Sequence, residues 1–429
     1  MISTERELEQ YFDRLWPICR SLTGPGVRET LDILSELVPM ERHRVRSGTR
    51  VFDWEVPDEW TIRAAYILTP DGRRIADFAT NNLHVWSYSV SVNAQMTLAE
   101  LKPHLRSLPN QPNAIPYVTS YYKRQWGFCI DHNTLLSLPE EGEYTVLIDS
   151  TLEPGFLDYG EAVLPGSSGR EVLFSTYICH PSMANNELSG PLAQAFLYRE
   201  IATLEKRKYT YRFVFAPETI GIIAYLDRVG SHLMETLDAG YVLTCCGDRG
   251  ALTYKASKRG NSLADRVARH VLRYSGKPHE LLPFAVGGSD ERQYCSPGFN
   301  LPVGSLMRTP YQRYAQYHTS LDNKDFISFG HLLDTVASYL DLVKVLELND
   351  VYVNKVAFCE PQLGKRGLYP DSANPDDDRE QTHNLLHLLA HAEGTLDLID
   401  IAEKRDISCL AFTSILNNQR LKEILTTKM

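Results

Sequence analysis

The chain has 429 residues, 43% of them hydrophobic and 23% charged, which is typical of a folded protein with two or three domains. Its formal net charge of −10 disfavours nucleic acid and anionic membrane as partners, because both bind clustered Lys and Arg. No apolar run approaches the roughly 18 residues that a membrane-spanning helix needs.

The first residues predict a helix and not a targeting signal. Thr4 and Glu7 have the spacing of a capping box, and the segment lacks a basic start followed by an apolar run. A second helix is expected over 27–37, after the break at Gly24-Pro25-Gly26. The eight cysteines contain no Cys-x-x-Cys pair. We therefore expect reduced thiols and a cytoplasmic location.

The next segment has the pattern of a small β domain. Strands are expected over 50–56 and 61–68, and Asp71-Gly72 marks a turn. Four prolines, at positions 103, 109, 112 and 116, then indicate a passage rich in loops. We predict that residues 46–140 form a β-rich insertion in a larger domain.

After Gly142, apolar strands alternate with amphipathic helices. The expected strands are 144–148, 172–178, 211–215, 239–246 and 301–307, and the expected helices are about 191–206, 220–236, 261–274 and 330–348. This alternation is typical of an α/β/α sandwich with a mostly parallel sheet and helices on both faces. Residues 1–45 and 141–350 are predicted to form this α/β domain.

Residues 351–429 are predicted to form a linker and a winged-helix-like domain. The stretch 370–380 is acidic and contains proline, and helical patterns follow over 385–390, 396–403 and 410–416. Residues 381–429 carry five Lys or Arg against six Asp or Glu, so DNA binding is not expected. The pattern favours a packing or oligomerising module, and a homo-oligomer is the corresponding expectation.

Polar residues follow the strand predicted over 172–178. His180, Asn186 and Glu187 lie between this strand and the helix that Pro191 opens. Ligand sites of open α/β sheets lie beyond the carboxyl ends of the strands, and an imidazole with a carboxylate can be part of a zinc site. Residues of this kind in such loops are, however, more often turn and cap residues.

Three other strand-end segments carry similar clusters. Glu218 follows the strand over 211–215, Asp290 precedes the strand over 301–307, and His318 follows that strand. Each alone also suits a cap or a solvated turn. Asp322, four residues after His318, could fix the tautomer of that histidine. Four clusters at successive strand ends predict that one crevice gathers them.

These segments resemble a known superfamily. In order they are His180, Asn186-Glu187-Leu-Ser-Gly190, Pro217-Glu218-Thr-x-Gly221, Gly288-Ser-Asp290 and Tyr317-His318-Thr-x-x-Asp322. They are similar to the motifs of the zinc aminopeptidases of the two-metal type, whose superfamily includes the single-zinc glutaminyl cyclases. More closely, the chain resembles bacterial aminopeptidase-like proteins with a small inserted β domain and a C-terminal winged helix. Some of these are labelled polysaccharide-biosynthesis proteins, and segments 179–190, 289–298 and 361–370 carry this closer likeness.

The resemblance assigns roles residue by residue. His180 and His318 match the first and last metal-binding histidines, and Glu218 matches the general base. Thr219 stands where the two-metal enzymes have a second glutamate, and Asn186 stands where they have the bridging aspartate. The later acidic ligand aligns near Thr244, and the nearest carboxylate is Asp248.

These replacements predict one zinc ion in preference to two, because a neutral amide cannot offset the charge of two adjacent dications. The expected ligands are His180, His318 and one carboxylate, for which we choose Glu187 over Asp248 or Asp290. By similarity to the cyclases, Asp290 would be a second acid or an orienting group. The candidates for contacting the substrate, including its carboxylate or phosphate, are Asn186, Arg292, Tyr294, Lys365 and Arg366.

The resulting prediction is a cytoplasmic, metal-dependent hydrolase of aminopeptidase type that acts on a small peptide or amide, with the insertion covering the cleft. Two alternatives stay open. The chain could be a non-hydrolytic binding or scaffold protein in a carbohydrate pathway, or a single-zinc enzyme of acyl transfer.

Overall fold

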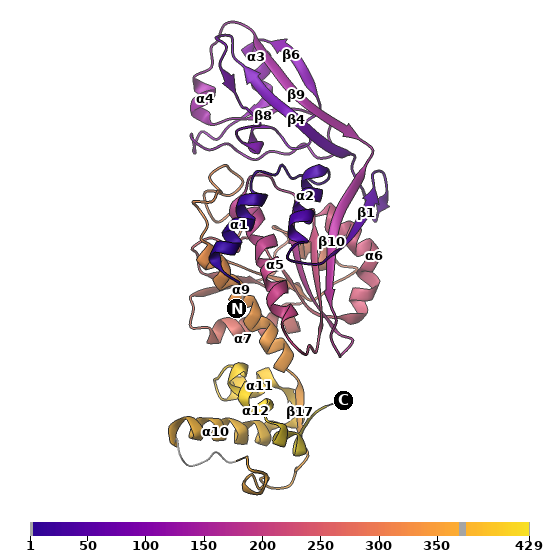
Figure 1. Cartoon of the computed structure of the whole chain (residues 1–429), viewed down its shortest axis with the longest axis vertical. Coiled ribbons are helices and arrows are strands. Elements are labelled where there is room, and N and C mark those ends of the chain that lie inside the picture. The colour runs from indigo at the N-terminus through magenta and orange to yellow at the C-terminus, as the bar shows by residue number, and fades with distance from the viewer. Residues whose placement is uncertain (1–2, 369–374, 429) are drawn as a thin grey trace. The chain divides into compact units, whose positions relative to one another are not determined.

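The computed structural model describes residues 3–368 and 375–428, and they fall into two compact units. The first unit comprises Met1–Ala264 and Pro278–Ala337, and the second comprises Asp265–Lys277 and Ser338–Met429 (Figure 1). All the residues predicted to form the site at the strand ends lie in the first unit. Lys365 and Arg366 belong to the second.

An eight-stranded mixed sheet forms the centre of the first unit. Its strand order is β1 (Glu41–Arg46), β10 (Phe156–Leu164), β12 (Thr210–Ala216), β11 (Glu171–Tyr177), β13 (Leu237–Val242), β16 (Val303–Met307), β14 (Leu252–Lys255) and β15 (His279–Leu282). The four strands β12, β11, β13 and β16 run parallel, whereas β10 and β14 join their two sides in the antiparallel direction. Every residue of β11 and β16 is buried, as expected for strands covered on both faces.

Helices cover this sheet. The helices before and after its central strands are α1 (Glu5–Leu15), α2 (Pro25–Leu34), α5 (Ser189–Ala202), α6 (Ile220–Thr236) and the short α8 (Glu291–Tyr294). Helix α5 packs on β11 and β12, and its residues Leu192, Ala195, Phe196 and Ile201 are fully buried. The predicted α/β class and the predicted helices near 191–206 and 220–236 are confirmed.

The insertion contains a separate four-stranded sheet in the order β5 (Arg74–Ile75), β4 (Glu59–Leu68), β9 (Tyr144–Glu153) and β6 (Val92–Met96). The prediction that 144–148 belongs to the α/β sheet is therefore wrong. Along β9, Tyr144, Val146 and Ile148 are buried and the residues between them are half-buried. This alternation is that of an antiparallel strand with one buried face, which a short apolar run does not distinguish from a central strand.

Smaller elements complete the insertion and its connections. They are the hairpin β2 (Arg50–Val51) and β3 (Trp54–Glu55), the pair β7 (Leu105–Arg106) and β8 (Phe128–Cys129), and the helices α3 (Leu98–Leu101) and α4 (His132–Leu136). The hairpin corresponds to the strand predicted over 50–56.

The second unit contains a three-stranded sheet in the order β18 (Glu393–Asp397), β17 (Val351–Asn354) and β19 (Leu425–Thr427). Its helices are α10 (Pro375–His391), α11 (Leu398–Lys404) and α12 (Thr413–Leu416), together with the later parts of α7 (Leu263–Tyr274) and α9 (Phe329–Leu348). The three predicted helical patterns are confirmed. The predicted linker is wrong over 375–380, which begin α10, and its residues 370–374 lie outside the described ranges.

Among the residues that the structure describes, no helix combines the length and the apolar character that crossing a membrane would require.

Gly24 offers a test of the fold at the start of α2. Its φ is +101°, and a Cβ added there would lie 2.3 Å from the backbone oxygen of Trp60. Gly48 has a similar φ of +80° but no atom within 4 Å of such a Cβ. We expect Gly24→Ala to lower the free energy of unfolding by more than ~3 kcal/mol and Gly48→Ala by about 1 kcal/mol, measured by urea unfolding. Equal losses would contradict the close approach at Gly24.

Candidate active site

The site is built on the loop that follows β11. Ile178, Cys179 and His180 continue from the strand, and one π-helical turn, Ala184–Leu188, leads into α5. Every residue from 178 to 190 is buried. A loop buried this completely must satisfy its polar groups within the protein, which fixes the directions of its side chains.

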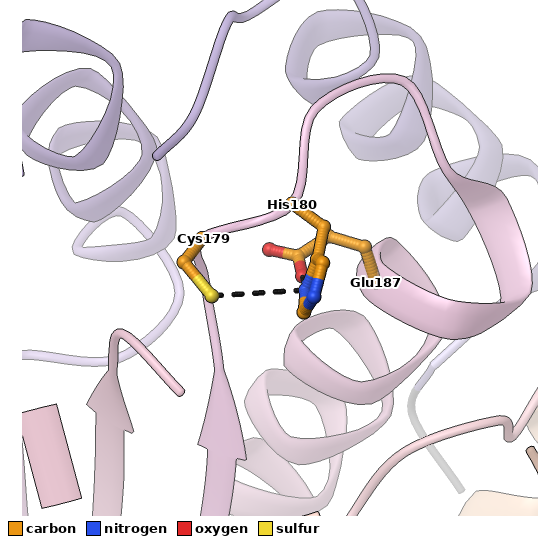
Figure 2. A group of neighbouring side chains, drawn as sticks. All are labelled: Cys179, His180 and Glu187. Carbon is orange, nitrogen blue, oxygen red and sulfur yellow. Dashed lines mark hydrogen bonds and ion pairs between the residues drawn. The ribbon is translucent and has the colours of Figure 1, made fainter. Parts of the chain in front are cut away.

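His180 lies between two glutamates. Its Nδ1 is 2.9 Å from Glu187 Oε2, and its Nε2 is 3.6 Å from Glu218 Oε2. The sulfur of Cys179 lies 3.7 Å from the same Nδ1 (Figure 2). Burial lowers the pKa of His180, but Cys179 and Glu187 more than offset this and raise it above its usual range. The contact with Glu187 fixes the ring and directs Nε2 toward Glu218.

Arg20 supports this arrangement from the segment after α1, a role that no motif in the sequence indicates. The side chains of Arg20 and Glu187 are both fully buried, and Arg20 Nε lies 3.5 Å from Glu187 Oε1. Arg20 also donates hydrogen bonds to the backbone oxygens of His180, at 3.0 Å, and Leu15, at 2.8 Å. The guanidinium thus neutralises a buried carboxylate and holds the loop that carries His180.

Glu218 lies in the turn between β12 and α6. Its side chain is 23% exposed, and its backbone amide donates to Cys179 Sγ at 3.2 Å. Burial raises the pKa of Glu218, and the positive charges of His180 and Arg292 oppose that rise. A carboxyl group with a raised pKa is suited to accept and return protons near neutral pH.

Asp290 and Arg292 hold the turn that carries Glu218. Thr219 has a φ of +66°, its amide donates to Asp290 Oδ1 at 2.7 Å, and Arg292 Nη2 donates to its Oγ1 at 3.0 Å. Asp290 is fully buried, and burial together with the charge of Glu218 raises its pKa well above the ordinary range. The sequence predicted a second acid or an orienting group at this position, and the hydrogen bond from Thr219 shows that Asp290 holds the turn.

His318 lies near His180, with 5.7 Å between the ring centroids. Its ring stacks on Tyr317 at 3.9 Å and meets the edge of Tyr117 at 5.3 Å. The amide of Tyr117 donates to His318 O at 2.9 Å. Burial and the neighbouring His180 lower the pKa of His318 to about 3, which keeps the imidazole neutral. Tyr117 belongs to the insertion, so the insertion helps to build the site.

The predicted role of Asp322 is wrong. Its two carboxylate oxygens accept hydrogen bonds from the amides of Asn185, at 2.7 Å, and Asn186, at 2.9 Å. Burial raises the pKa of Asp322 to about 7 although these amides favour the charged form. The residue caps the π-helical turn, and between the described residues no hydrogen bond joins it to His318. Spacing along the chain did not reveal this cap because the turn lies far away in sequence.

The carboxylate of Asp248 is also engaged in hydrogen bonds within the protein. It accepts hydrogen bonds from Gly250, from Thr309 and from the side chain of Asn185. Its carboxylate is therefore committed to the loop after β13, which leaves Glu187 as the better placed of the alternatives near His180.

Neutral groups stand where the resemblance would place further carboxylates. Asn186 Nδ2 donates to the hydroxyl of Tyr177 at 2.9 Å, and that hydroxyl also hydrogen-bonds to Thr244. Asn186 Oδ1 is buried and has no hydrogen-bond partner in the described part of the chain. This network needs no charge and offers none to a second metal ion.

Cys179, His180 and Glu187 could hold a metal. One donor atom from each lies within 4.8 Å of the others, and no other set of this kind, with His318 or without it, occurs among the side chains of residues 3–368 and 379–428. Sulfur, imidazole and carboxylate are all zinc donors, and Glu187 Oε1 is buried with the ion pair to Arg20 as its contact and no hydrogen bond among the described residues. The donor set therefore fits zinc. Cys179 was missed from the sequence, although its place beside His180 was a signal.

A pocket of about 350 Å³ opens beside these groups. Its lining residues are Leu22, Trp54, Tyr121, Tyr122, Cys179, His180, Glu218, Thr219, Ile220 and Arg292. Arg292 thus lies at the pocket, as predicted for a substrate contact. Tyr294 does not, because it is fully buried and its hydroxyl donates to Ser175 Oγ at 2.9 Å inside the core.

Comparison with protein families supports the two-part organisation. Residues 9–349 match the family described as "Domain of unknown function (DUF4910)", and residues 350–427 match a winged helix-turn-helix. The chain belongs to this DUF4910 family. A Clostridium acetobutylicum protein named "Putative polysaccharide biosynthesis protein with aminopeptidase-like domain" is 45% identical over 94% of this chain and 92% of its own length.

Solved structures show the fold. A crystal structure from Clostridium acetobutylicum, described as a "putative peptidase", has a TM-score of 0.92 at 42% identity and covers 99% of this chain and 96% of that one. A zinc aminopeptidase from Bacillus subtilis has a TM-score of 0.55 at 12% identity, covering 80% of this chain and 94% of that one. The first unit of the DUF4910 chain therefore has an aminopeptidase-like α/β fold, as the resemblance predicted.

The buried pair of Arg20 and Glu187 can be tested by comparison with an exposed pair. Arg20→Met leaves Glu187 charged and buried, so we expect a loss of about 3–5 kcal/mol in the free energy of unfolding. The control is Arg14→Met, because Arg14 and Glu36 are paired at 45% and 47% exposure, and its expected loss is below ~1 kcal/mol. Chemical unfolding measures both. Similar losses would show that Arg20 does not compensate a buried charge.

Proposed function

We propose that the chain is a zinc-dependent hydrolase of aminopeptidase type that cleaves a small peptide or amide. The observation that carries the proposal is the position of His180, held by Glu187 on one ring nitrogen and facing Glu218 with the other at the wall of a pocket. The aminopeptidase-like fold and the name of the Clostridium relative support the same class of reaction.

His180, Glu187 and His318 would hold one ion, with Cys179 as a further donor within reach of the first two. A zinc ion bound there supplies Lewis acidity and lowers the pKa of a water molecule. The neutral network of Tyr177, Asn186 and Thr244 supports one ion in preference to two, because it supplies no bridging carboxylate.

Glu218 would take the proton of the attacking water and return it to the leaving amine. Its place in the pocket wall gives it access to water and to substrate. Asp290 and Arg292 position it by holding the amide and the hydroxyl of Thr219. The reaction thus needs one carboxylate that can exchange protons and two residues that keep it in place.

A second candidate is a binding protein of a polysaccharide pathway that no longer hydrolyses its ligand. Asn186 and Thr219 favour it, because they replace two acidic residues of the resembling enzymes, and the name of the Clostridium relative favours that pathway. Metal content and turnover separate the two candidates.

Metal content tests the ligands directly. We expect about one zinc per chain in protein purified without chelator, as for a catalytic site with an open position. His180→Ala and His318→Ala should lose it, and His232→Ala, an exposed histidine on α6, should keep it. Elemental analysis gives the ratio. Equal zinc in all four proteins would refute the assignment, and no zinc in the wild type would favour the binding protein.

Replacing Glu218 tests the proton transfer. Glu218→Gln keeps the shape of the side chain but cannot accept the proton, so turnover should fall by about 100-fold or more while zinc is retained. Glu205→Gln, at an exposed position, serves as the control and should be unaffected. The measurements are kcat on a panel of aminoacyl amides and zinc per chain. Unchanged kcat in Glu218→Gln would remove this residue as the base.

A further inference from the structure

The residues that line the pocket form two chemically different groups. One is formed by the residues of the proposed reaction, namely Cys179, His180, Glu218, Thr219 and Arg292. The other is formed by apolar and aromatic side chains, namely Leu22, Trp54, Tyr121, Tyr122 and Ile220. The proposed reaction gives no role to the apolar and aromatic residues, and it uses Arg292 only through its contact with Thr219 and its charge near Glu218.

Trp54 and Tyr122 form an exposed aromatic pair. Their rings meet edge to face with centroids 5.8 Å apart, and they are 42% and 51% exposed. Tyr122 has a φ of +63°, and its hydroxyl donates to Glu55 O at 3.2 Å, which ties it to the strand that carries Trp54. A positive φ at a residue other than glycine and an aromatic ring exposed to water both cost free energy. Such features concentrate at binding sites.

The hairpin that carries Trp54 is anchored to the α/β part of the first unit. Phe52, at its turn, has a φ of +54°, and its ring meets the edge of Phe299 with 5.7 Å between centroids. Phe299 belongs to the segment that follows α8. This contact holds the hairpin of Trp54 against the segment that follows α8, the helix that carries Arg292.

Arg292 makes no close ion pair, although its positive charge acts on the nearby carboxyl groups of Glu218 and Asp290. It donates to Thr219 Oγ1, but its Nε is buried and has no hydrogen-bond partner among the described residues. Within the described ranges no carboxylate lies at ion-pair distance from it, although ion pairs are frequent in the rest of the first unit. A guanidinium at a pocket wall with an unused donor is suited to bind a carboxylate or a phosphate.

We propose that the substrate is a small anionic amide, whose carboxylate or phosphate binds Arg292 and whose apolar side chain or ring packs on Trp54 and Tyr122. The assignment rests on the proposed function for the bond that is cleaved, but the binding of the anion and of the ring does not require turnover. The volume of about 350 Å³ is at the lower end for ligand pockets and limits the substrate to a small molecule.

Two ligands that differ in charge test the proposal. N-acetylphenylalanine and N-acetylphenylalaninamide share the ring and the amide, and only the first has a carboxylate. We expect calorimetry on the wild type to show at least about tenfold tighter binding of the first, which corresponds to about 1.4 kcal/mol. Arg292→Gln should abolish this preference, and Arg292→Lys should keep part of it. Trp54→Ala should weaken the binding of both ligands by the same factor.

Arg6→Gln, at an exposed position on α1, is the control and should bind as the wild type does. Inorganic phosphate, used as a competitor, tells whether the anion is a phosphate or a carboxylate. Equal binding of the two ligands to the wild type, no binding of either at millimolar concentration, or a preference retained in Arg292→Gln would overturn the proposal. Zinc content and hydrolysis are measured separately, so a failure of the proposed function would be recognised as such.

Discussion

The buried contact between Arg20, Glu187 and His180 is the constraint on which the site depends. A carboxylate with no exposed surface is tolerated only with a compensating charge, and Arg20 supplies it from a segment 160 residues before His180. The same guanidinium binds backbone oxygens of Leu15 and His180, so the end of α1 and the loop after β11 form one structure. The imidazole is oriented because the carboxylate beside it is itself held.

The sequence predicted those parts of the site that follow from the sheet. His180 and Glu218 each follow an apolar strand, and the carboxyl ends of neighbouring parallel strands meet at one edge. In the structure, His180 Nε2 and Glu218 Oε2 are 3.6 Å apart, in agreement with this rule. Arg20, Tyr117 and Trp54 lay beyond prediction, because each comes from a distant segment with no periodicity or spacing that links it to a strand end.

The errors have a common physical origin. Asp322 was expected beside His318 because it follows that residue by four positions. Its carboxylate instead accepts hydrogen bonds from the backbone amides of Asn185 and Asn186, which have no partner within the π-helical turn. The strand over 144–148 was assigned to the wrong sheet because an apolar run does not tell which strand will pair with it. In both cases the deciding partner is remote in the chain, so a local pattern cannot identify it.

The insertion belongs to the site and is more than a cover. Its residue Tyr117 binds the backbone of His318 and contacts the rings of both histidines, while Trp54 and Tyr122 line the pocket beside His180 and Glu218. The groups of the proposed reaction and Arg292 therefore lie near the strand ends of the α/β sheet, and the aromatic rings that would pack on the substrate lie on the insertion and on the β2–β3 hairpin. Because the two sets come from separate segments, substitutions of the aromatic residues would alter which ligand binds and would leave the contact between Glu187 and His180 in place.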